Sequence, residues 1–356
     1  MENFFNNILE SGSIVASPSK DPDYNFHWVR DSAIVMKSII TLFEKDKKNQ
    51  KYIKIIENYI RTECKHINFH PAEPKFLLDK TPYLGDWGRP QNDGPALRGI
   101  VCLKLLKVYG RKQKELLKII FNDLSYTIEQ LEEPCFDLWE EEYGYHLYTR
   151  IVQYKFLCEC LFSDKVDYED LDEGIINRSR ELLGHHFSND KIYSSYNIHG
   201  EILREYDSSV LLGLSHVDYK LKDFDCFSEN MNNYIYAMTA KFNEIYPINK
   251  KLNIPFLGRY FNDHYFNGNP WIISTIALYQ YCFSSGNIYY DKHQFKNFLK
   301  FIYNDKKLIL SEQIHRETGQ DVSVEKLTWN YSELITLFKF IKNFHINNLI
   351  DLFVPE

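Results

Sequence analysis

The chain has 356 residues, of which 44% are hydrophobic, and this is enough to bury a sizeable core. Its 42 basic and 49 acidic residues give a net charge of −7, and no cluster of Lys or Arg stands out, so nucleic acid is not an expected partner. No apolar run reaches the roughly 18 residues that a membrane-spanning helix needs, so we expect no membrane partner either.

The N-terminal segment, residues 1–7, has neither the basic region nor the apolar region of a secretory signal. The seven cysteines are odd in number and show no zinc or disulfide spacing. Both features are typical of a protein in a reducing compartment, so we predict a cytoplasmic location. A secreted chain whose signal peptide had been removed would look the same.

Apolar residues recur at helical spacing through most of the chain, and the alternation typical of strands is sparse. We therefore predict an all-α protein. In chain order, the pattern predicts about twelve helices, near residues 2–11, 31–46, 49–65, 95–110, 112–131, 146–163, 167–185, 207–217, 225–246, 270–285, 292–304 and 328–343.

The connections between these helices alternate between short and long. The short ones fall near residues 47, 111, 165, 220 and 288, and the long ones span about 12–30, 66–94, 132–145, 186–206, 247–269 and 305–327. Loops longer than about 12–15 residues are uncommon in compact domains and are usually functional. A long loop before every second helix is what an (α/α)6 barrel, a toroid of six inner and six outer helices, would produce, with all long loops on one face. An irregular α-helical bundle is the alternative.

The long loops hold the residues that could act chemically. Arg30 and Asp31 lie together, and sugar hydroxyls could accept hydrogen bonds from the first and donate them to the second. The structural alternative is a helix cap at Asp31 and an ion pair at Arg30. Residues 85–95 combine Gly and Pro with Trp87 and Arg89, which indicates a rigid backbone around a ligand; a plain surface loop is the alternative.

Glu140 lies in the third long loop among acidic neighbours, Asp137, Glu141 and Glu142. Like charges disfavour ionisation, and Trp139 could supply a low-dielectric wall, so both would raise the pKa of a carboxyl group here. A raised pKa is what a general acid needs near neutral pH. The alternative is a solvated acidic turn.

Glu312 stands beside Gln313 in the sixth long loop. An ionised carboxylate there could activate a water molecule that Gln313 helps to hold; a surface glutamate is the alternative. In the predicted barrel, the third and sixth long loops lie opposite each other. An acid and a base about 6.5–9.5 Å apart form the geometry of inverting glycoside hydrolysis.

The sequence shows no metal-binding constellation, and we expect neither a metal nor an organic cofactor. His66 and His70 have i, i+4 spacing, but no third ligand follows at a suitable distance. Nucleophile motifs of the Ser-His-Asp or Cys-His type are also absent. The 5 tryptophans lie in long loops or at their junctions with helices, which favours a carbohydrate site because sugar rings stack on aromatic side chains. A core rich in Tyr and Phe explains most other aromatic residues.

At these residues the chain resembles glycoside hydrolase family 15, the glucoamylases. Motifs similar to those of the family run through nearly the whole chain in the family's order. They are residues 16–19, 24–32, 87–91 with 93–98, 137–141, 258–260, 267–271, and 311–313 with 327–329. Chance agreement at so many separated positions is not plausible.

The resemblance implies an (α/α)6 barrel that releases β-glucose from the non-reducing ends of α-glucans with inversion. It implies that Glu140 is the general acid, that Glu312 is the general base and that Asp137 supports the acid electrostatically. The residues that it implies in substrate binding are Tyr24, Trp28, Arg30, Asp31, Trp87, Gly88, Arg89, Trp139, Glu141, Arg259, Asp263, Trp271 and Gln313. Among them, Tyr24 and Trp28 match the aromatic floor near the cleaved bond.

The chain also departs from the family pattern. Phe26 and His27 are unusual in the first motif, and bulky residues follow the acid at Tyr143, Tyr145 and His146. These differences leave the linkage and chain-length preference open. We see neither a starch-binding domain nor an N-terminal β-sandwich, so we expect residues 1–356 to form a single catalytic domain, to be a monomer, and to act on soluble oligosaccharides.

We therefore predict an inverting, exo-acting α-glucosidase that acts on α-1,4-linked gluco-oligosaccharides or glucans. Trehalose, or an isomaltose- or dextran-like glucan, is the alternative substrate. A glycan-binding protein without turnover is the alternative from another class, and the presence of both Glu140 and Glu312 argues against it. Phosphorolysis on the same barrel is a further alternative, which a water-activating base at Glu312 disfavours.

Overall fold

A computed structural model describes residues 2–188, 191–218, 228–285, 291–303 and 308–342. Its tertiary contacts divide the chain into two compact units that alternate along the sequence. Unit 1 comprises Met1–Asn7, Ser17–Tyr24 and Tyr206–Glu356, and unit 2 comprises Ile8–Ala16 and Asn25–Glu205. In the described part of the chain, no helix is long and apolar enough to cross a membrane.

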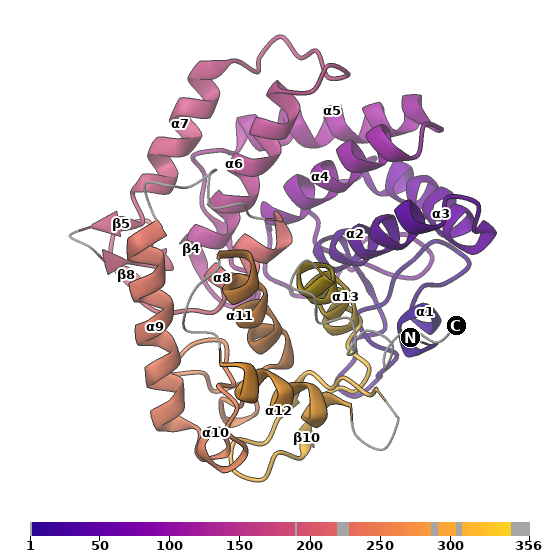
Figure 1. The fold of residues 1–356 in the computed structure, drawn as a ribbon. Helices are drawn as coiled ribbons and strands as arrows, with labels where there is room; N and C mark the ends of the chain where they lie inside the picture. Colours follow the sequence, from indigo (N-terminus) through magenta and orange to yellow (C-terminus); the bar gives the residue numbers. More distant parts are fainter. Residues whose placement is uncertain (1, 189–190, 219–227, 286–290, 304–307, 343–356) are drawn as a thin grey trace. The chain divides into compact units, whose positions relative to one another are not determined.

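The helices of unit 2 differ in how much of their surface is buried. Its helices are α2 (Val29–Lys45), α3 (Gln50–His66), α4 (Asp93–Val108), α5 (Gln113–Glu129), α6 (Leu147–Leu161) and α7 (Glu173–Gly184). Almost every residue in the first turns of α2, α4 and α6 is buried, whereas α3, α5 and α7 bury residues at helical spacing on one face. Figure 1 accordingly shows α3, α5 and α7 on the outer side of α2, α4 and α6.

Short antiparallel strands tie the long loops of unit 2 together. β1 (His27–Trp28) pairs with β2 (Lys75–Phe76), and β5 (Phe187–Ser188) pairs with β6 (Lys191–Ile192). β3 (Cys135–Phe136), β4 (Tyr143–His146), β7 (Ser195–Tyr196) and β8 (Ile202–Arg204) form a sheet in that order. This sheet fixes the third long loop against the fourth, because pairing satisfies backbone groups that would otherwise need other partners.

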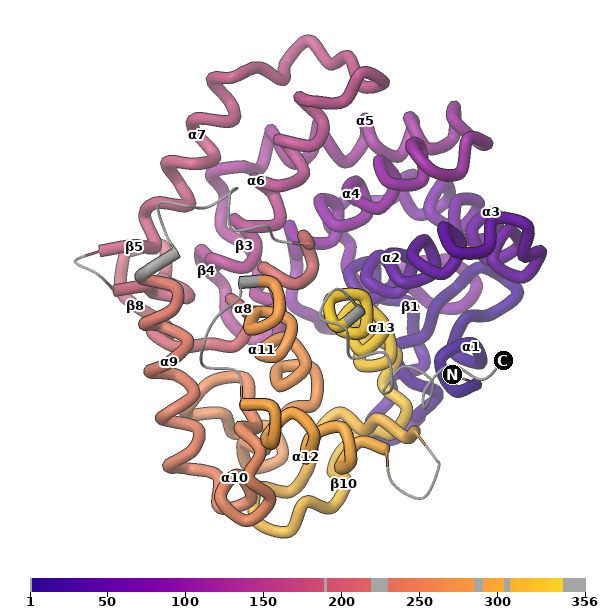
Figure 2. Tube along the Cα trace, in the orientation of Figure 1, coloured from indigo at the N-terminus to yellow at the C-terminus, as the bar shows by residue number. Residues whose placement is uncertain are grey.

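Unit 1 has a similar division between buried and one-sided helices. Its elements are α1 (Glu2–Asn6), α8 (Ser209–His216), α9 (Ser228–Ile245), α10 (Pro247–Leu252), the short 3-10 helix η2 (Tyr265–Asn267), α11 (Ile272–Ser285), α12 (Lys292–Ile302), β9 (Gln313–Ile314), β10 (Asp321–Val322) and α13 (Thr328–Lys342). α11 packs against α8 and α13, and β9 pairs antiparallel with β10. Figure 2 shows α1 beside α13, on which it packs.

Each of the twelve predicted helices overlaps a helix in the described part of the chain, but the ends differ. The helix predicted at 167–185 begins at Glu173, because the Asp172 carboxylate accepts the Ile175 N–H at 2.9 Å and caps it there. The first helix ends at Asn6, and neither α10 nor η2 was predicted. The predicted positions 225–227, 304 and 343, and the connections near 220 and 288, lie outside the described residues.

Candidate active site

Glu140 stands in the tight loop that joins β3 to β4 in unit 2. The Asp137 N–H donates to the Glu142 carbonyl, and the Glu140 N–H donates to the Asp137 carbonyl, each at 3.0 Å. Glu140 has a φ of +67°, a left-handed conformation that residues other than glycine seldom adopt. Such conformations persist where surrounding structure holds them, and they concentrate at functional sites. The loop therefore presents Glu140 in a fixed, unusual backbone geometry.

Three donors converge on one oxygen of the Glu140 side chain. Trp28 Nε1 and Gln91 Nε2 each donate to Oε1 at 2.9 Å, and the Arg30 guanidinium donates to it at 3.4 Å. Within the described residues, no donor reaches Oε2. If the carboxyl group is protonated, this arrangement places the proton on Oε2, since Oε1 accepts all three hydrogen bonds. The side chain is 17% exposed, so it is shielded but open to a ligand.

Arg30 links Glu140 to the start of α4. Its Nη1 donates to Gln91 Oε1 and Asp93 Oδ2, both at 2.9 Å. Burial opposes the charge, but the carboxylates of Asp93, Glu140 and Asp31 raise the pKa of Arg30, which remains a cation. Burial raises the pKa of Asp31 to about 7, against the lowering effect of Arg30. Asp31 can therefore donate or accept a hydrogen bond near neutral pH.

Asp137 is buried in the same loop as Glu140 and holds that loop from within. Its Oδ1 accepts the N–H groups of Glu141 at 2.7 Å and Glu142 at 2.9 Å, and its Oδ2 lies 2.6 Å from the Arg204 guanidinium. Burial favours the neutral form, but Arg204, His146 and the backbone donors lower the pKa of Asp137 below its ordinary value. Arg204 also contacts Glu141 at 3.1 Å. The acidic neighbours of Glu140 are thus paired with Arg204.

Lys75 on β2 is enclosed by four aromatic rings next to the acid. Its Nζ lies 3.5 Å from the ring centroid of Trp87, 4.0 Å from that of Phe26, 4.3 Å from that of Tyr83 and 4.7 Å from that of Trp28. Lys75 is only 2% exposed. A cation over aromatic faces is attracted by their negative charge, most strongly where water is excluded. Lys75 therefore holds these rings in place as one wall.

The loop from Tyr83 to Gln91 is held closed by Arg89. Its Nε donates to Glu73 at 2.8 Å, and its Nη groups donate to the carbonyls of Gly85 at 3.1 Å and of Tyr83. The Trp87 Nε1 donor, by contrast, is buried and makes no hydrogen bond to another described residue. Arg89 therefore binds its own loop, whereas the buried Trp87 donor has no partner among the described residues.

Gly88 allows the acid-bearing loop to approach this second loop. A Cβ at Gly88 would lie 2.8 Å from the Phe136 ring and 3.2 Å from the Glu140 carbonyl oxygen. Real Cβ atoms rarely make such close contacts, so a larger residue would push one loop away from the other. Gly88 contributes to the site by being small.

Glu312 lies in unit 1 and is buried, with 1% of its surface exposed. Tyr24 Oη donates to Oε1 at 2.8 Å, and Gln313 Nε2 donates to Oε2 at 3.0 Å. Burial raises the pKa of Glu312 above its ordinary value, although these two hydrogen bonds act to lower it. The Gln313 Oε1 acceptor is buried and makes no hydrogen bond to the described residues.

Arg259 forms a second polar group in unit 1. It makes two hydrogen bonds to Asp263, Nε to Oδ2 at 2.8 Å and Nη2 to Oδ1 at 2.6 Å. The rings of Tyr265 and Trp271 lie 5.2 and 5.3 Å from its guanidinium carbon, and Tyr265 contacts the Tyr24 hydroxyl at 3.0 Å. A paired Arg and Asp among aromatic rings have the chemistry of a site for a neutral, hydroxyl-rich ligand.

The structure gathers the predicted site residues into one group per unit. In unit 2, Trp28, Trp87, Gly88, Arg89, Asp137, Trp139, Glu140 and Glu141 lie on loops and short strands, and Arg30 and Asp31 lie in the first turn of α2. In unit 1 lie Tyr24, Arg259, Asp263, Trp271, Glu312 and Gln313. The sequence reasoning missed Lys75 and Arg204. Both lie in long loops that hold other basic residues as well, so no signal in the sequence singled them out.

His27, Glu63 and His66 form a buried cluster in unit 2 that has the residue types of a metal site. His27 Nδ1 accepts the Ile14 N–H at 3.0 Å, so its Nε2, 3.1 Å from Glu63, carries the proton of the neutral ring. Arg98 also donates to Glu63 at 3.2 Å. A protonated nitrogen and a competing guanidinium do not fit metal ligation, and the cluster is instead a hydrogen-bonded support beneath β1.

Comparisons with known proteins agree with this chemistry. The profile of glycosyl hydrolases family 15 matches residues 6–294. The chain is 28% identical to a glucoamylase of Blastobotrys adeninivorans, covering 93% of this chain and 68% of that protein. It is 29% identical to glucoamylase-1 of Arthroderma benhamiae, covering 92% of this chain and 64% of that protein. The chain thus spans about two thirds of the length of these relatives.

A solved structure shows the fold as well. The glucoamylase of Saccharomycopsis fibuligera superposes with a TM-score of 0.82 at 23% identity, covering 96% of this chain and 93% of that one. The fold is therefore the predicted all-α (α/α)6 barrel. The match of the family profile over most of the chain also confirms the resemblance seen in the sequence motifs. The chain belongs to glycosyl hydrolases family 15 and is a glycoside hydrolase.

Proposed function

We propose that the protein is an inverting, exo-acting α-glucosidase of the glucoamylase type, which releases β-D-glucose from non-reducing ends of α-1,4-linked gluco-oligosaccharides or glucans. Glu140 is the general acid and Glu312 the general base. The observation that carries this proposal is the contrast between the two carboxylates. Donors cover one oxygen of Glu140 and leave the other for a proton, whereas Glu312 is buried beside an amide oxygen that can hold water.

The proposed reaction is a single displacement. Glu140 Oε2 gives its proton to the glycosidic oxygen as the bond from that oxygen to the anomeric carbon breaks. A water molecule attacks the anomeric carbon from the opposite face, and Glu312 takes a proton from it. The α-glycoside thus becomes β-glucose. Arg30, Trp28 and Gln91 stabilise the Glu140 carboxylate that remains, because all three already donate to its Oε1.

Other predicted residues act in three ways in this proposal. Trp87, Asp31 and the Arg259–Asp263 pair bind sugar hydroxyls directly, since each has a donor or acceptor. Arg89 and Asp137 act through the backbone that they hold. Gly88 acts through its size.

The decisive experiment follows the anomer released from maltotriose by NMR. We expect β-glucose as the first product, from the non-reducing end. Glu140→Gln and Glu312→Gln should each lower the rate by roughly a hundredfold or more, because general acid or base placement is worth about 10²–10⁴. Glu325→Gln, at an exposed position of the sixth loop, is the control and should match the wild type. Initial release of α-glucose, or near-normal turnover in either variant, would contradict the assignment.

The same assay separates the alternatives. Faster turnover of isomaltose or trehalose than of maltotriose would make that sugar the preferred substrate and leave the proposed mechanism unchanged. Maltose binding without glucose release would make the protein a glycan-binding protein, and glucose 1-phosphate formed in added phosphate would make it a phosphorylase. We also propose that residues 1–356 form a single domain and that the protein is a cytoplasmic monomer. Sedimentation would test the monomer, and fractionation of the source cells would test the compartment.

A further inference from the structure

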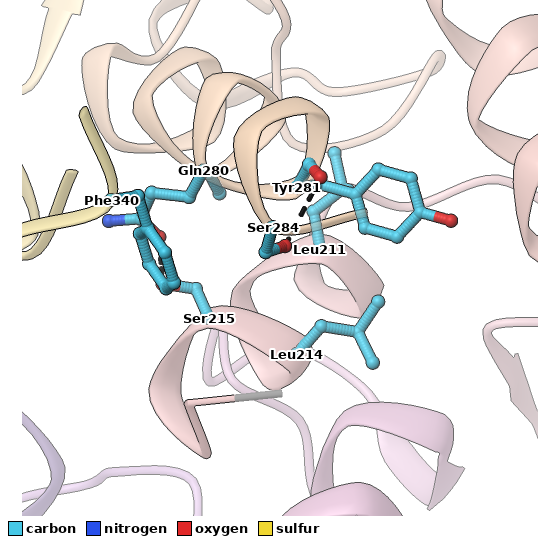
Figure 3. A pocket seen from close by; sticks show the side chains of 8 residues that line it. Leu211, Leu214, Ser215, Gln280, Tyr281, Ser284 and Phe340 are labelled. Atoms are coloured by element: carbon cyan, nitrogen blue, oxygen red, sulfur yellow. Dashed lines mark hydrogen bonds between the residues drawn. The ribbon is translucent and has the colours of Figure 1, made fainter. Parts of the chain in front are cut away.

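Two cavities are lined neither by Glu140 and Glu312 nor by the side chains that donate hydrogen bonds to them. Figure 3 shows Leu214, Gln280, Tyr281 and Phe340 around the first, which lies in unit 1 and holds about 10 Å³. That is room for about one water molecule. The second lies in unit 2 and holds about 310 Å³. It reaches the lower end of the range for ligand sites, about 300–1,000 Å³, so it can take a small molecule.

The second cavity, which we call the Gln130 pocket, has a wall from each of three segments. It is lined by His70, Glu73, Arg89, Pro90, Tyr126 and Gln130. None of the residues that donate to Glu140 lines it, so it is a different place from the acid site. The Tyr126 ring is fixed at its floor, because its hydroxyl donates to Asn92 Oδ1 at 2.8 Å.

The charges in the Gln130 pocket cancel. Glu73 is 9% exposed and accepts from Arg89 Nε at 2.8 Å, while the other donors of Arg89 go to loop carbonyls. An anionic ligand would meet the Glu73 carboxylate, and a cationic ligand would meet the Arg89 guanidinium. The pocket therefore selects a neutral ligand.

The remaining polar groups match a ligand rich in hydroxyls. His70 Nδ1 accepts the Ala72 N–H at 3.2 Å, so the neutral ring presents an Nε2–H donor. The Gln130 amide makes no hydrogen bond to another described residue and offers both a donor and an acceptor. Glu73 keeps lone pairs beyond those that Arg89 uses. With Pro90 and the Tyr126 ring as apolar surfaces, these groups fit one sugar ring.

A short stretch of backbone connects the Gln130 pocket to the residues around Glu140. Arg89 and Pro90 belong to both the pocket and the loop that carries Trp87 and Gln91. The Gln91 N–H donates to the Ala72 carbonyl at 3.3 Å, and its side chain donates to Glu140 at 2.9 Å. A ligand in the pocket would therefore touch the loop that orients the acid.

We propose that the Gln130 pocket is an accessory binding site for a single neutral hexose ring, either free glucose or the terminal unit of a glucan. The pocket's size, its balanced charges and its hydrogen-bonding groups indicate that the ligand is a hexose. The choice of glucose among hexoses rests on the proposed function. The site lies behind the loop from Tyr83 to Gln91 and adds one sugar to whatever the acid and base groups bind.

The test counts glucose molecules bound per chain by equilibrium dialysis with radiolabelled glucose on the full-length protein. Two per chain are expected for the wild type. Gln130→Trp should fill the pocket and leave one, whereas Glu129→Trp, which adds the same bulk at the exposed neighbouring position, should still bind two. His70→Ala is a milder variant and should weaken the second site by roughly tenfold, the worth of one hydrogen bond.

Equal binding by Gln130→Trp, Glu129→Trp and the wild type would overturn the proposal. The count does not depend on hydrolysis, so a protein inactive on maltotriose would refute the proposed function and still report on this pocket. A sulfur-linked maltotriose that cannot be cleaved distinguishes the sources. If it displaces the glucose that Gln130→Trp loses, the pocket takes glucan ends; if it does not, the pocket takes free glucose.

Discussion

The residues around Glu140 and Glu312 give these two carboxylates different environments. Glu140 is surrounded by donors, among them the cation Arg30, and a backbone φ of +67° fixes its position. Glu312 is more deeply buried, and it depends on the hydroxyl of Tyr24 and the amide of Gln313. In the proposed mechanism, the first environment would stabilise the carboxylate left after proton transfer, and burial in the second would raise the basicity of the group that accepts a proton.

Arg204 is expected to position the acid without touching substrate. Arg204→Met removes contacts to Asp137 at 2.6 Å and Glu141 at 3.1 Å, and it leaves a buried carboxylate unpaired. Hydrogen bonds to charged groups are worth about 1.5–3 kcal/mol, so kcat/KM on maltose should fall by roughly 10–100-fold. Because the loop of the acid is displaced, kcat should fall more than KM rises.

The control for Arg204 is an arginine with a similar pair of partners at the surface. Arg178 contacts Glu132 at 2.7 Å and Glu181 at 2.8 Å and is 36% exposed. Arg178→Met should leave kcat and KM unchanged, since exposed ion pairs contribute little. Arg204→Lys should restore part of the activity. Equal effects of the two Met variants would reduce Arg204 to a general stabilising residue.

Tyr24 is expected to set the acidic limb of the pH–rate profile. The base must be ionised, and burial raises the pKa of Glu312, so kcat/KM should fall at a higher pH than an ordinary glutamate would give. The Tyr24 hydrogen bond lowers that pKa. Tyr24→Phe removes the bond but keeps the ring, so the acidic limb should move to higher pH.

Kinetics from about pH 3 to 8 would measure this shift, with Tyr265→Phe as the comparison. Tyr265 contacts the Tyr24 hydroxyl at 3.0 Å but makes no hydrogen bond to Glu312, so its variant should shift the limb less. If the acidic limb of Tyr24→Phe stays at the wild-type pH, that limb does not report the ionisation of Glu312.

At the scale of elements, the helices were predictable and the strands were not. Helical periodicity extends over ten or more residues, as in α3 and α5, and so stands out from a single sequence. β3 and β7 have two residues each, and no alternation can be seen in so short a run. The partner of Asp137 was hidden for the same reason, because Arg204 reaches it only through the sheet.

The candidate site could be proposed from the sequence where its motifs are contiguous. Glu140 with Asp137, and Glu312 with Gln313, are neighbours in the sequence and were singled out there. The aromatic rings that enclose Lys75 come from two separate loops, and only the pairing of β1 with β2 brings these loops together. The left-handed backbone of Glu140 depends on hydrogen bonds that close its loop, which side-chain patterns do not reveal.

The packing of two loops at Gly88 gives a prediction at this scale. Gly88→Ala places a Cβ 2.8 Å from the Phe136 ring, and overpacking of this kind costs about 1–3 kcal/mol. We expect the acid loop to shift and kcat on maltose to drop at least tenfold while circular dichroism stays native. Gly184→Ala, where nothing lies within 4 Å of the added Cβ, should leave kcat unchanged.

A second substitution tests whether the cause is steric. Adding Phe136→Leu to Gly88→Ala removes part of the ring that the new Cβ meets, so the double variant should regain activity. If the single and double variants are equally impaired, the contact with Phe136 is not the reason that glycine is needed.

At the scale of the whole molecule, the two units are made of segments that alternate along the sequence. The chain passes between the units after Asn7, Ala16, Tyr24 and Glu205, so neither unit is one continuous stretch. Unit 1 depends on its short N-terminal segments. Asn7 donates to Thr328 at 2.8 Å, and Tyr24 donates to Glu312 at 2.8 Å, across some 300 residues of sequence.

This interleaving predicts that the chain unfolds as one cooperative domain. Local loss of unit 1 would release segments 1–7 and 17–24, which flank segment 8–16 of unit 2, and so would perturb both units. Differential scanning calorimetry should give a single transition whose calorimetric and van't Hoff enthalpies agree. Asn7→Ala, which removes a buried hydrogen bond of unit 1, should lower the midpoint of that whole transition. Two transitions, with only one of them moved by Asn7→Ala, would mean that the units are separate domains.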